Sequence, residues 1–508
     1  MNDTKRIVLN TGFLYGKMLI SMFIALYSTR IVLNALGVED FGIFNLVAGV
    51  IAMLSFLNSA MTTATQRYLS FSIGTKEEGK INSVFKSSVI LHLIIGAIIV
   101  IILEVAGIFL FDGFLNIPEN RIATAKAVYH FMVISTFFTI NAVPYDAAII
   151  AHENLLFDAI VGIIESILKL AIAIILTFSQ NDRLILYGML MAGLIIFTRI
   201  IKSIYCYSKY SECKHVGRAK FDVSLIKEMF SFARWNLFGA LCVLGRSQGI
   251  AILLNVFFGT IVNAAYAISN QVANQMIFFS ASLLRAMNPQ IMKSEGMNDR
   301  QRMLRLSMMA SKFGFFMVAF IAIPSLFEMS EILKLWLKTV PEHTVVFCSL
   351  FLITSLVNQT TVGLQSAIQA TGKIKLYQTI VGGTVLLNVP LAYLLLKFEL
   401  PPYSVLIGSV VLEILACTFR LIILKRIAGL SINEYFERVI LKEVIPIFVI
   451  TITCWLSTTY LTFNLRFLVT FSFSIMTFFV SIYFTGLDND EKQYINSVVQ
   501  KKLKKLKK

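Results

Sequence analysis

The sequence predicts an all-α protein that crosses a membrane many times. Of its 508 residues, 57% are hydrophobic and only 15% are charged, whereas a soluble protein must cover its surface with more polar side chains than this. The apolar residues form stretches close to the roughly 20 residues that an α-helix needs to cross a bilayer. Lys and Arg residues gather in every second gap between these stretches. Together these observations predict a polytopic membrane protein.

The apolar stretches number about fourteen. We expect each to form one helix, because backbone polar groups in lipid must be satisfied within the chain. Turn-forming or acidic residues separate them, such as GVED at 37–40 and SQND at 179–182. An even number of spans places both termini on one side of the membrane. The predicted spans are residues 8–33, 41–62, 84–111, 124–149, 156–178, 184–206, 231–257, 261–287, 306–333, 344–369, 377–396, 403–424, 443–461 and 466–486.

Positive charge alternates along the chain. Gaps on one side of the membrane would hold 31 of the 45 Lys and Arg residues, and the opposite gaps would hold only seven. Cytoplasmic loops collect Lys and Arg, so we expect both termini in the cytoplasm. The start MNDTKR leads straight into an apolar stretch and predicts an uncleaved signal anchor. Lys312 and Arg420 are placed near cytoplasmic ends of spans.

Two parts of the chain repeat one pattern. IVLNALGVEDFGIFNLVAGV (31–50) and ILLNVFFGTIVNAAYAISNQV (252–272) each run through Leu-Asn and a glycine turn into a helix with small and amide residues. The pattern pairs the first span with the seventh and the second with the eighth. Such an offset predicts a parallel repeat about an axis along the membrane normal. Chance similarity between two apolar hairpins is the alternative.

Three segments resemble a known family. STRIVLNALGVEDFGIFNLVAGVI (28–51), VPYDAAIIAHEN (143–154) and NVFFGTIVNAAYAISNQV (255–272) are similar to bacterial polysaccharide flippases of the multidrug/oligosaccharidyl-lipid/polysaccharide exporter (MOP) superfamily. The resemblance implies two six-helix bundles around a central cavity, with two further helices. It also implies flipping of undecaprenyl-diphosphate-linked oligosaccharide across the bacterial inner membrane by alternating access. The product would serve lipopolysaccharide O-antigen, capsule or another surface polysaccharide.

This resemblance divides the chain into five parts. A cytoplasmic linker would contain an amphipathic helix at 221–232, and a second amphipathic helix is expected at 431–442. The expected parts are an N-terminal six-helix bundle (1–206), the cytoplasmic linker (207–230), a C-terminal six-helix bundle (231–424), an amphipathic linker with two extra transmembrane helices (425–486) and a basic cytoplasmic tail (487–508).

Basic residues within predicted spans are candidates for binding a diphosphate, because a charge at membrane depth is costly and tends to face a cavity or a partner. Arg246 is the first candidate. It lies near the middle of its span in GRSQG (245–249), and a guanidinium can bind phosphate through two parallel hydrogen bonds. The predicted diphosphate-binding residues are Arg246, Arg30, Lys17 and Arg234.

Structural roles remain open for these basic residues. Arg246 could bond to carbonyls of a neighbouring helix, and Arg30 could reach the periplasmic interface near the GVED turn. Arg234, beside Trp235, could be an interfacial anchor. Lys17 and Arg30 lie about 140° apart around a helix, so they need not face one site.

Acidic and amide residues supply two further sets of candidates. Glu165 precedes Lys169 by four residues, the favourable order for an ion pair, and either a structural pair or an ion relay would fit. Glu104, Asp146 and Glu413 are the other acids at membrane depth, and any of them could take a proton in a coupled cycle. Amides both donate and accept hydrogen bonds, which suits sugar hydroxyls, although they also join helices. The predicted sugar-binding amides are Asn270, Gln271, Asn274 and Gln275.

Several functions are disfavoured. No phosphate-cradling Gly loop with Lys and no Ser/His/Asp arrangement stands out, so we expect neither ATP hydrolysis nor another enzymatic activity. The five histidines are scattered and the six cysteines form no C-x-x-C pair, so no metal or other cofactor is expected. The net charge of +16 is assigned to topology and anionic lipid rather than to nucleic acid.

The expected partners are lipid-linked oligosaccharide, membrane lipid and, as a candidate, the polysaccharide polymerase machinery. The main alternative is a proton- or sodium-coupled multidrug exporter of the same superfamily. Cation exporters need acids in the cavity, whereas spans one and seven carry basic residues and no Asp or Glu. A membrane glycosyltransferase or polymerase would carry a large periplasmic loop, which the predicted topology lacks.

Overall fold

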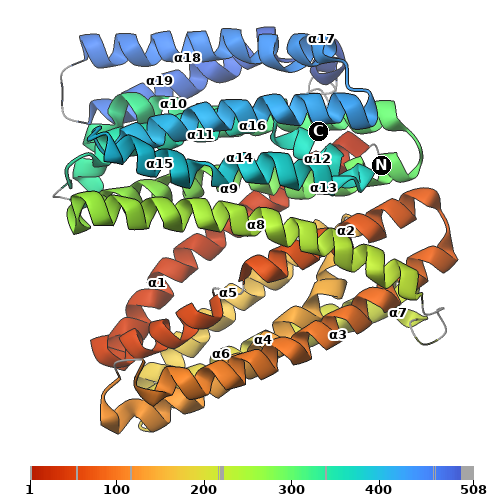
Figure 1. Cartoon of the computed structure of the whole chain (residues 1–508), viewed down its shortest axis with the longest axis vertical. Helices are drawn as coiled ribbons and strands as arrows, with labels where there is room; N and C mark the ends of the chain where they lie inside the picture. The colour runs from red at the N-terminus through yellow and green to blue at the C-terminus, as the bar shows by residue number, and fades with distance from the viewer. Residues whose placement is uncertain are drawn as a thin grey trace, which may run out of the picture. The chain divides into compact units, whose positions relative to one another are not determined.

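The computed structural model contains helices and turns but no strand among the residues that it describes (Figure 1). These are residues 3–52, 55–114, 117–215, 217, 222–337, 340–461, 463 and 465–493. The all-α fold class is therefore confirmed. The chain divides into two compact units, and each consists of two stretches of sequence. The first unit is Met1–Ala240 with Asn288–Asp299, and the second is Leu241–Met287 with Arg300–Lys508.

The first unit is built around α4, which packs against α2, α3 and α6, while α1 packs along α5. Asp182 starts α6 by accepting hydrogen bonds from the backbone N–H groups of Leu184 and Ile185, as expected of an N-cap residue. The elements that contribute to this unit are α1 (Asp3–Ala52), α2 (Ser55–Thr75), α3 (Glu78–Phe109) with a π turn (Leu110–Phe114), a 3₁₀ turn (Glu119–Arg121), α4 (Ile122–Ala151), α5 (Leu155–Phe178), α6 (Arg183–Lys209), α7 (Ser211–Lys214), the start of α8 (Val223–Phe258) and the end of α9 (Thr260–Gly296).

The second unit is built around α10, which packs against α11, α12, α18 and α19. In addition, α16 packs against α11 and α15. Besides the remaining parts of α8 and α9, the unit contains α10 (Arg300–Leu337), α11 (Thr344–Gln359), α12 (Val362–Thr371), α13 (Ile374–Tyr377), a π turn (Gln378–Gly382), α14 (Gly383–Leu386), α15 (Asn388–Lys397), α16 (Ser404–Ala428), α17 (Ile432–Tyr435), a π turn (Phe436–Ile440), α18 (Leu441–Tyr460), α19 (Arg466–Ser481) and a π turn (Ile482–Gly486).

The two predicted glycine turns share one backbone conformation. Gly37 interrupts α1 with φ 81°, and Gly259 separates α8 from α9 with φ 80°. A residue with a Cβ rarely adopts this left-handed region, whereas glycine does so readily. The repeated sequence pattern at 31–50 and 252–272 therefore has a structural counterpart in two equivalent breaks.

The sequence predicts about fourteen spans. Among the described residues, eleven helices are long and apolar enough to cross a membrane, and α11 with α12, bent by 45°, would make twelve. Of the other two predicted spans, 41–62 runs over residues outside the described ones, and 261–287 is not among the eleven. The second of these is helical within α9, but its amides lower its hydropathy. The structure thus supports a multi-pass membrane protein with eleven or twelve candidate spans.

The predicted linker helix is not separate from the span that follows it. Val223–Phe258 forms one continuous helix, so the segments predicted at 221–232 and 231–257 merge. Phe221 lies outside the described residues, as does most of the predicted basic tail (494–508). The five-part domain division stays a prediction.

Candidate functional site

The second unit holds a carboxylate with three polar partners. Glu413 on α16 is buried and accepts a hydrogen bond of 2.7 Å from Asn358 Nδ2. Arg420 Nη2 lies 3.2 Å from Glu413 Oε1, and Arg246 Nη1 lies 3.9 Å from Glu413 Oε2. Arg420 also donates a hydrogen bond of 3.0 Å to Thr361 Oγ1. With one carboxylate and two guanidinium groups, the cluster has an excess positive charge.

Arg246 is the member of this cluster that keeps its donors unused. Its side chain is 26% exposed, and it donates no hydrogen bond to any described residue, because 3.9 Å exceeds hydrogen-bonding distance. A Cβ at Gly249 would lie 2.7 Å from Val389, so α8 approaches its neighbour closely beside Arg246. Hydrogen bonding of Arg246 to neighbouring carbonyls, the structural alternative, is not observed among the described residues.

Two basic residues predicted near cytoplasmic span ends are buried. The side chain of Arg420 is 5% exposed, and that of Lys312 is 2% exposed. Lys312 Nζ lies 2.7 Å from Glu491 Oε2 and 3.4 Å from Asp488 Oδ2. Arg420 could have been recognised from its position seven residues after Glu413, which places both on one face of α16.

The first unit contains a balanced charge network. Lys17 Nζ on α1 donates a hydrogen bond of 3.2 Å to Asp158 Oδ2, which is buried on α5. Lys202 Nζ lies 2.6 Å from Asp146 Oδ1 and 3.7 Å from Asp158 Oδ1. The stem of Lys17 crosses α5 at Gly162, where a Cβ would lie 2.1 Å from Lys17 Cε. Two predicted site residues, Lys17 and Asp146, are thus held in ion pairs.

Arg30 and Arg234 lie apart from these networks. Arg30 is exposed and has no hydrogen bond or ion pair with any described residue. Arg234 is also exposed, and its guanidinium lies 5.8 Å from the ring centroid of Trp235. This contact fits the predicted interfacial anchor.

The predicted sugar-binding amides lie on α9 with their polar groups largely unused. Asn274 Nδ2 donates a long hydrogen bond of 3.4 Å to Asn270 Oδ1. Gln271, Asn274 and Gln275 are exposed, whereas Asn270 is half-buried. Among the described residues, no hydrogen bond joins these amides to Arg246.

Two of the acids proposed for coupling pair with residues close to them. Lys169 Nζ lies 2.7 Å from Glu165 Oε1, four residues earlier on α5. His130 Nδ1 lies 3.1 Å from Glu104 Oε2 across α3 and α4, and both side chains are more than 40% exposed. The predicted geometry of the Glu165–Lys169 pair is confirmed, and its role stays a prediction.

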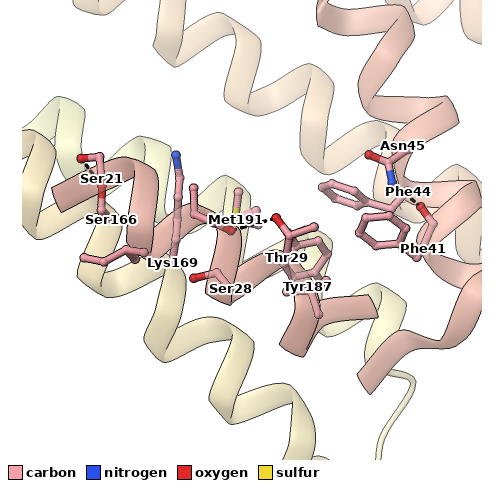
Figure 2. Close-up of a pocket in the computed structure, with 13 residues that line it drawn as sticks. Ser21, Ser28, Thr29, Phe41, Phe44, Asn45, Ser166, Lys169, Tyr187 and Met191 are labelled. Carbon is pink, nitrogen blue, oxygen red and sulfur yellow. Dashed lines mark hydrogen bonds between the residues drawn. The ribbon is translucent and has the colours of Figure 1, made fainter. Parts of the chain in front are cut away.

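Lys169 also lines a pocket of about 380 Å³ in the first unit (Figure 2). The break at Gly37 lets both halves of α1 contribute to the wall, and α5 and α6 complete it. In Figure 2, Ser21 and Ser166 lie at one side of the pocket, and Phe41, Phe44 and Asn45 lie at the other. The lining residues are Ser21, Ile24, Ala25, Ser28, Thr29, Val32, Phe41, Phe44, Asn45, Ser166, Lys169, Tyr187 and Met191.

Three turns of the first unit are joined by one arginine. Arg121 donates hydrogen bonds to Asp40, at the predicted periplasmic turn, and one of 2.9 Å to Asp182 Oδ2. Thr124 Oγ1 donates a further hydrogen bond of 3.1 Å to Asp182. Although burial acts to raise the pKa of Asp182, the hydrogen bonds from Arg121, Ile185 and Thr124 hold this pKa below its ordinary value. From the sequence, Asp40 and Asp182 were predicted only as acidic residues of turns, and their shared contact with Arg121 was not predicted.

The turn between α4 and α5 is a second cluster that sequence reasoning missed. His152 Nε2 lies 2.6 Å from Glu212 Oε1 on α7, and Asn154 bonds to Tyr205 on α6. The backbone oxygen of the intervening Glu153 accepts a hydrogen bond of 3.0 Å from Asn10 on α1.

The side chain of Glu153 extends these contacts to α9. Its carboxylate accepts hydrogen bonds from Gln290 and Lys293. Glu153 adopts φ 59°, a conformation that is uncommon for a residue with a Cβ. Within the first unit, three consecutive residues therefore connect four helices, so this part of VPYDAAIIAHEN has a structural role.

Comparisons with known proteins give the fold. No protein-family profile matches the chain. The chain is 21% identical over 252 residues to the uncharacterized membrane protein EpsK of Bacillus subtilis (strain 168), a match that covers 49% of each protein and thus about half the length of that relative. An outward-facing multidrug resistance MATE family transporter of the MOP superfamily matches with TM-score 0.72 and 14% identity, covering 84% of this chain and 97% of that chain.

A MOP superfamily transporter from Pyrococcus furiosus, whose reversed binding-pocket polarity suggests a different function, matches with TM-score 0.71 and 13% identity. That match covers 84% of this chain and 96% of that one. The chain has the MATE fold. The resemblance seen in the sequence is therefore supported at the level of the fold. At this identity the MATE fold does not define the cargo.

Proposed function

We propose that the protein is a flippase that moves a lipid-linked oligosaccharide with an anionic diphosphate from the cytoplasmic to the periplasmic leaflet. The observation that carries this proposal is the state of Arg246. It lies in the middle of an apolar helix, is partly exposed, and donates no hydrogen bond to the described residues. A guanidinium with unused donors at membrane depth is suited to bidentate binding of phosphate.

Charge in the second unit supports an anionic cargo. The Glu413 carboxylate already accepts a hydrogen bond from Asn358 and forms an ion pair with Arg420. It therefore does not need Arg246 to compensate its charge. In the first unit, Arg30 on α1 is exposed and pairs with no described residue, which separately suits an anionic cargo. An inside-negative membrane potential would favour outward movement of an anion by about 2.3 kcal/mol per charge per 100 mV.

The ion pairs of the first unit reduce the number of candidate diphosphate-binding residues. Lys17, predicted to bind the diphosphate, donates to buried Asp158 instead, so we assign it a structural role and exclude it from the proposed binding set. Arg246 and Arg30 remain as principal candidates. Arg234 is a weaker candidate for binding the diphosphate, because its contact with Trp235 also fits a role as an interfacial anchor.

A multidrug exporter is the competing function, and the match to a multidrug resistance MATE transporter favours it. A cationic drug needs an available carboxylate. Glu413, Asp146 and Asp158 are each paired with a basic side chain, which argues against a cationic cargo. The Pyrococcus relative supports the view that the fold tolerates binding pockets of different polarity.

The test is a flipping assay in proteoliposomes with a fluorescent prenyl-diphosphate oligosaccharide. We expect Arg246→Ala to lower the flipping rate about tenfold or more and Arg246→Lys to restore it partly, since lysine keeps the charge but not the planar fork. Arg285→Ala, outside the proposed site, is the control. The proposal fails if Arg246→Ala flips the lipid normally, or if the protein transports only cationic dyes.

A further inference from the structure

The pocket beside the Gly37 break carries hydrogen-bonding groups that the protein itself does not satisfy. Ser28 is 8% exposed, and its Oγ has no hydrogen-bond partner among the described residues. The Tyr187 hydroxyl also bonds to no described residue, although its side chain is only half-buried. A buried polar group without a partner costs free energy, so the Ser28 hydroxyl favours a ligand that can donate and accept hydrogen bonds, and the Tyr187 hydroxyl is available to the same ligand.

Other lining groups have spare capacity of both kinds. Asn45 Nδ2 donates to Phe41 O over 2.7 Å, which leaves the Asn45 carbonyl oxygen as an acceptor. Lys169 uses one ammonium proton on Glu165 and retains two. The pocket therefore presents donors and acceptors together, as a polyhydroxylated ligand requires, rather than the oxygen ligands alone that a metal ion requires.

The walls of the pocket are partly aromatic. The rings of Phe44 and Tyr187 lie 4.5 Å apart between centroids, and Phe41 lies beside Phe44 in Figure 2. At the other side, the Ser166 hydroxyl donates to Ser21 Oγ over 2.8 Å. Small-molecule sites combine such apolar surface with a few placed polar groups, and a pyranose ring has an apolar face and hydroxyls that match both.

Size and charge exclude a bare cation as the preferred ligand. The volume of about 380 Å³ is in the range of small-molecule sites, roughly 300–1,000 Å³, and far exceeds that of one water, roughly 30 Å³. Among the described residues, Lys169 is the one charged side chain in the lining, and no carboxylate contributes to it. A positive side chain repels a cation but can donate hydrogen bonds to sugar oxygens.

We infer that this pocket binds one sugar unit of the cargo. The inference rests on the proposed function and adds to it a location in the first unit, which the predicted amides on α9 do not supply. Ser28 and Tyr187 hydrogen-bond the sugar hydroxyls, Asn45 accepts from them, and Phe41 and Phe44 contact the ring.

The test uses saturation-transfer NMR on the full chain in lipid nanodiscs, which avoids detergents with sugar headgroups. The probes are methyl hexosides and methyl N-acetylhexosaminides at millimolar concentration. We expect at least one saccharide to give a signal that Ser28→Ala/Tyr187→Phe lowers about tenfold, because two neutral hydrogen bonds are lost. Ser203→Ala/Tyr207→Phe removes two hydroxyls from α6 outside the pocket and should leave the signal unchanged.

Two further measurements separate the possible outcomes. The thermal unfolding temperature of both double variants, with and without sodium chloride, shows whether they fold and whether the pocket binds sodium. The absence of any saccharide signal, a signal unaffected by Ser28→Ala/Tyr187→Phe, or a sodium-dependent stabilisation lost in that variant would overturn the sugar assignment. Flipping that still depends on Arg246 would then leave the proposed function intact, whereas saccharide binding without such flipping would contradict the proposed function alone.

Discussion

The two units place basic residues in the membrane in different ways. In the first unit, two lysines, Lys17 and Lys202, pair with two aspartates among the described residues. In the second unit, Arg246 and Arg420 share one glutamate. Lys17 and Arg246 had the same predicted role, yet one is bound to a buried acid and the other has unused donors. A basic residue within a span thus indicates a binding site only when its acidic partners are already satisfied by other groups.

The largest effect is expected at the shared glutamate of the second unit. Glu413→Ala leaves buried Arg420 without its carboxylate, and breaking a buried pair from one side typically costs about 3–5 kcal/mol. Unfolding of the purified protein by denaturant should show this loss. Glu331→Ala, which removes an acid from an exposed pair with Lys334, is the matched control and should change stability by less than about 1 kcal/mol. Equal losses in both variants would refute the view that Glu413 anchors the unit.

Double-mutant cycles would measure the contrast between the units directly. We expect a coupling free energy of about 1–3 kcal/mol between Lys17 and Asp158, from Lys17→Met and Asp158→Asn, because the pair is hydrogen-bonded at 3.2 Å. Coupling between Arg246 and Glu413 should be below about 1 kcal/mol, because their closest polar atoms are 3.9 Å apart. A stronger coupling in the second cycle would mean that Arg246 is a structural residue.

The stability of the first unit should also depend on pH, through the Glu212–His152 pair outside the membrane spans. Burial is the largest single influence and acts to raise the pKa of Glu212, but the hydrogen bond and charge of His152 together with further hydrogen bonds outweigh it, and the pKa lies below the ordinary value of 4.5. A lowered folded pKa contributes stability that is present above pH 4.5 and lost as pH falls through the folded value. Unfolding temperatures between pH 6 and pH 3 should therefore fall less steeply in Glu212→Gln than in the native protein. Glu342→Gln, at an exposed glutamate, should follow the native profile.

The smallest effect is expected at the exposed pair on α5. Glu165→Gln should change stability by about 0.3–0.5 kcal/mol, as for other helical pairs four residues apart, and should leave the pH dependence of flipping unchanged. Flipping rates measured across a pH series test this expectation. A shifted pH profile would instead support the proton relay considered from the sequence, and would make the first unit more than a structural scaffold.

Local features were predictable from the sequence, and distant ones were not. The turns at Gly37 and Gly259 and the Glu165–Lys169 pair depend on residues within one or two helical turns. By contrast, Lys17 and Asp158 are 141 residues apart, and Glu153 and Lys293 are 140 residues apart. No periodicity in a single sequence indicates which helices will pack together, so these pairs required the fold.

The segment at 261–287 shows a related limit of local patterns. It is predicted to be a span from its length and apolar residues, but its amides reduce its hydropathy, and it is not among the eleven candidate spans of the described residues. The sequence likewise shows that Arg246 is a costly charge in the membrane. It does not show that Asn358 and Arg420 already contact the Glu413 carboxylate and so leave the donors of Arg246 unused. The availability of a charged group depends on its neighbours in space.

The turn at His152–Asn154 has a consequence for biogenesis. Its Glu153 carboxylate is buried, and the groups that bond it, Gln290 and Lys293, belong to a segment that follows residues of the other unit. During synthesis, the first unit therefore cannot reach its final form when α8 has emerged. It must wait until α9 is complete, so the two units cannot mature strictly one after the other. A chain truncated before Asn288 would lack Gln290 and Lys293, two donors to the buried Glu153 carboxylate.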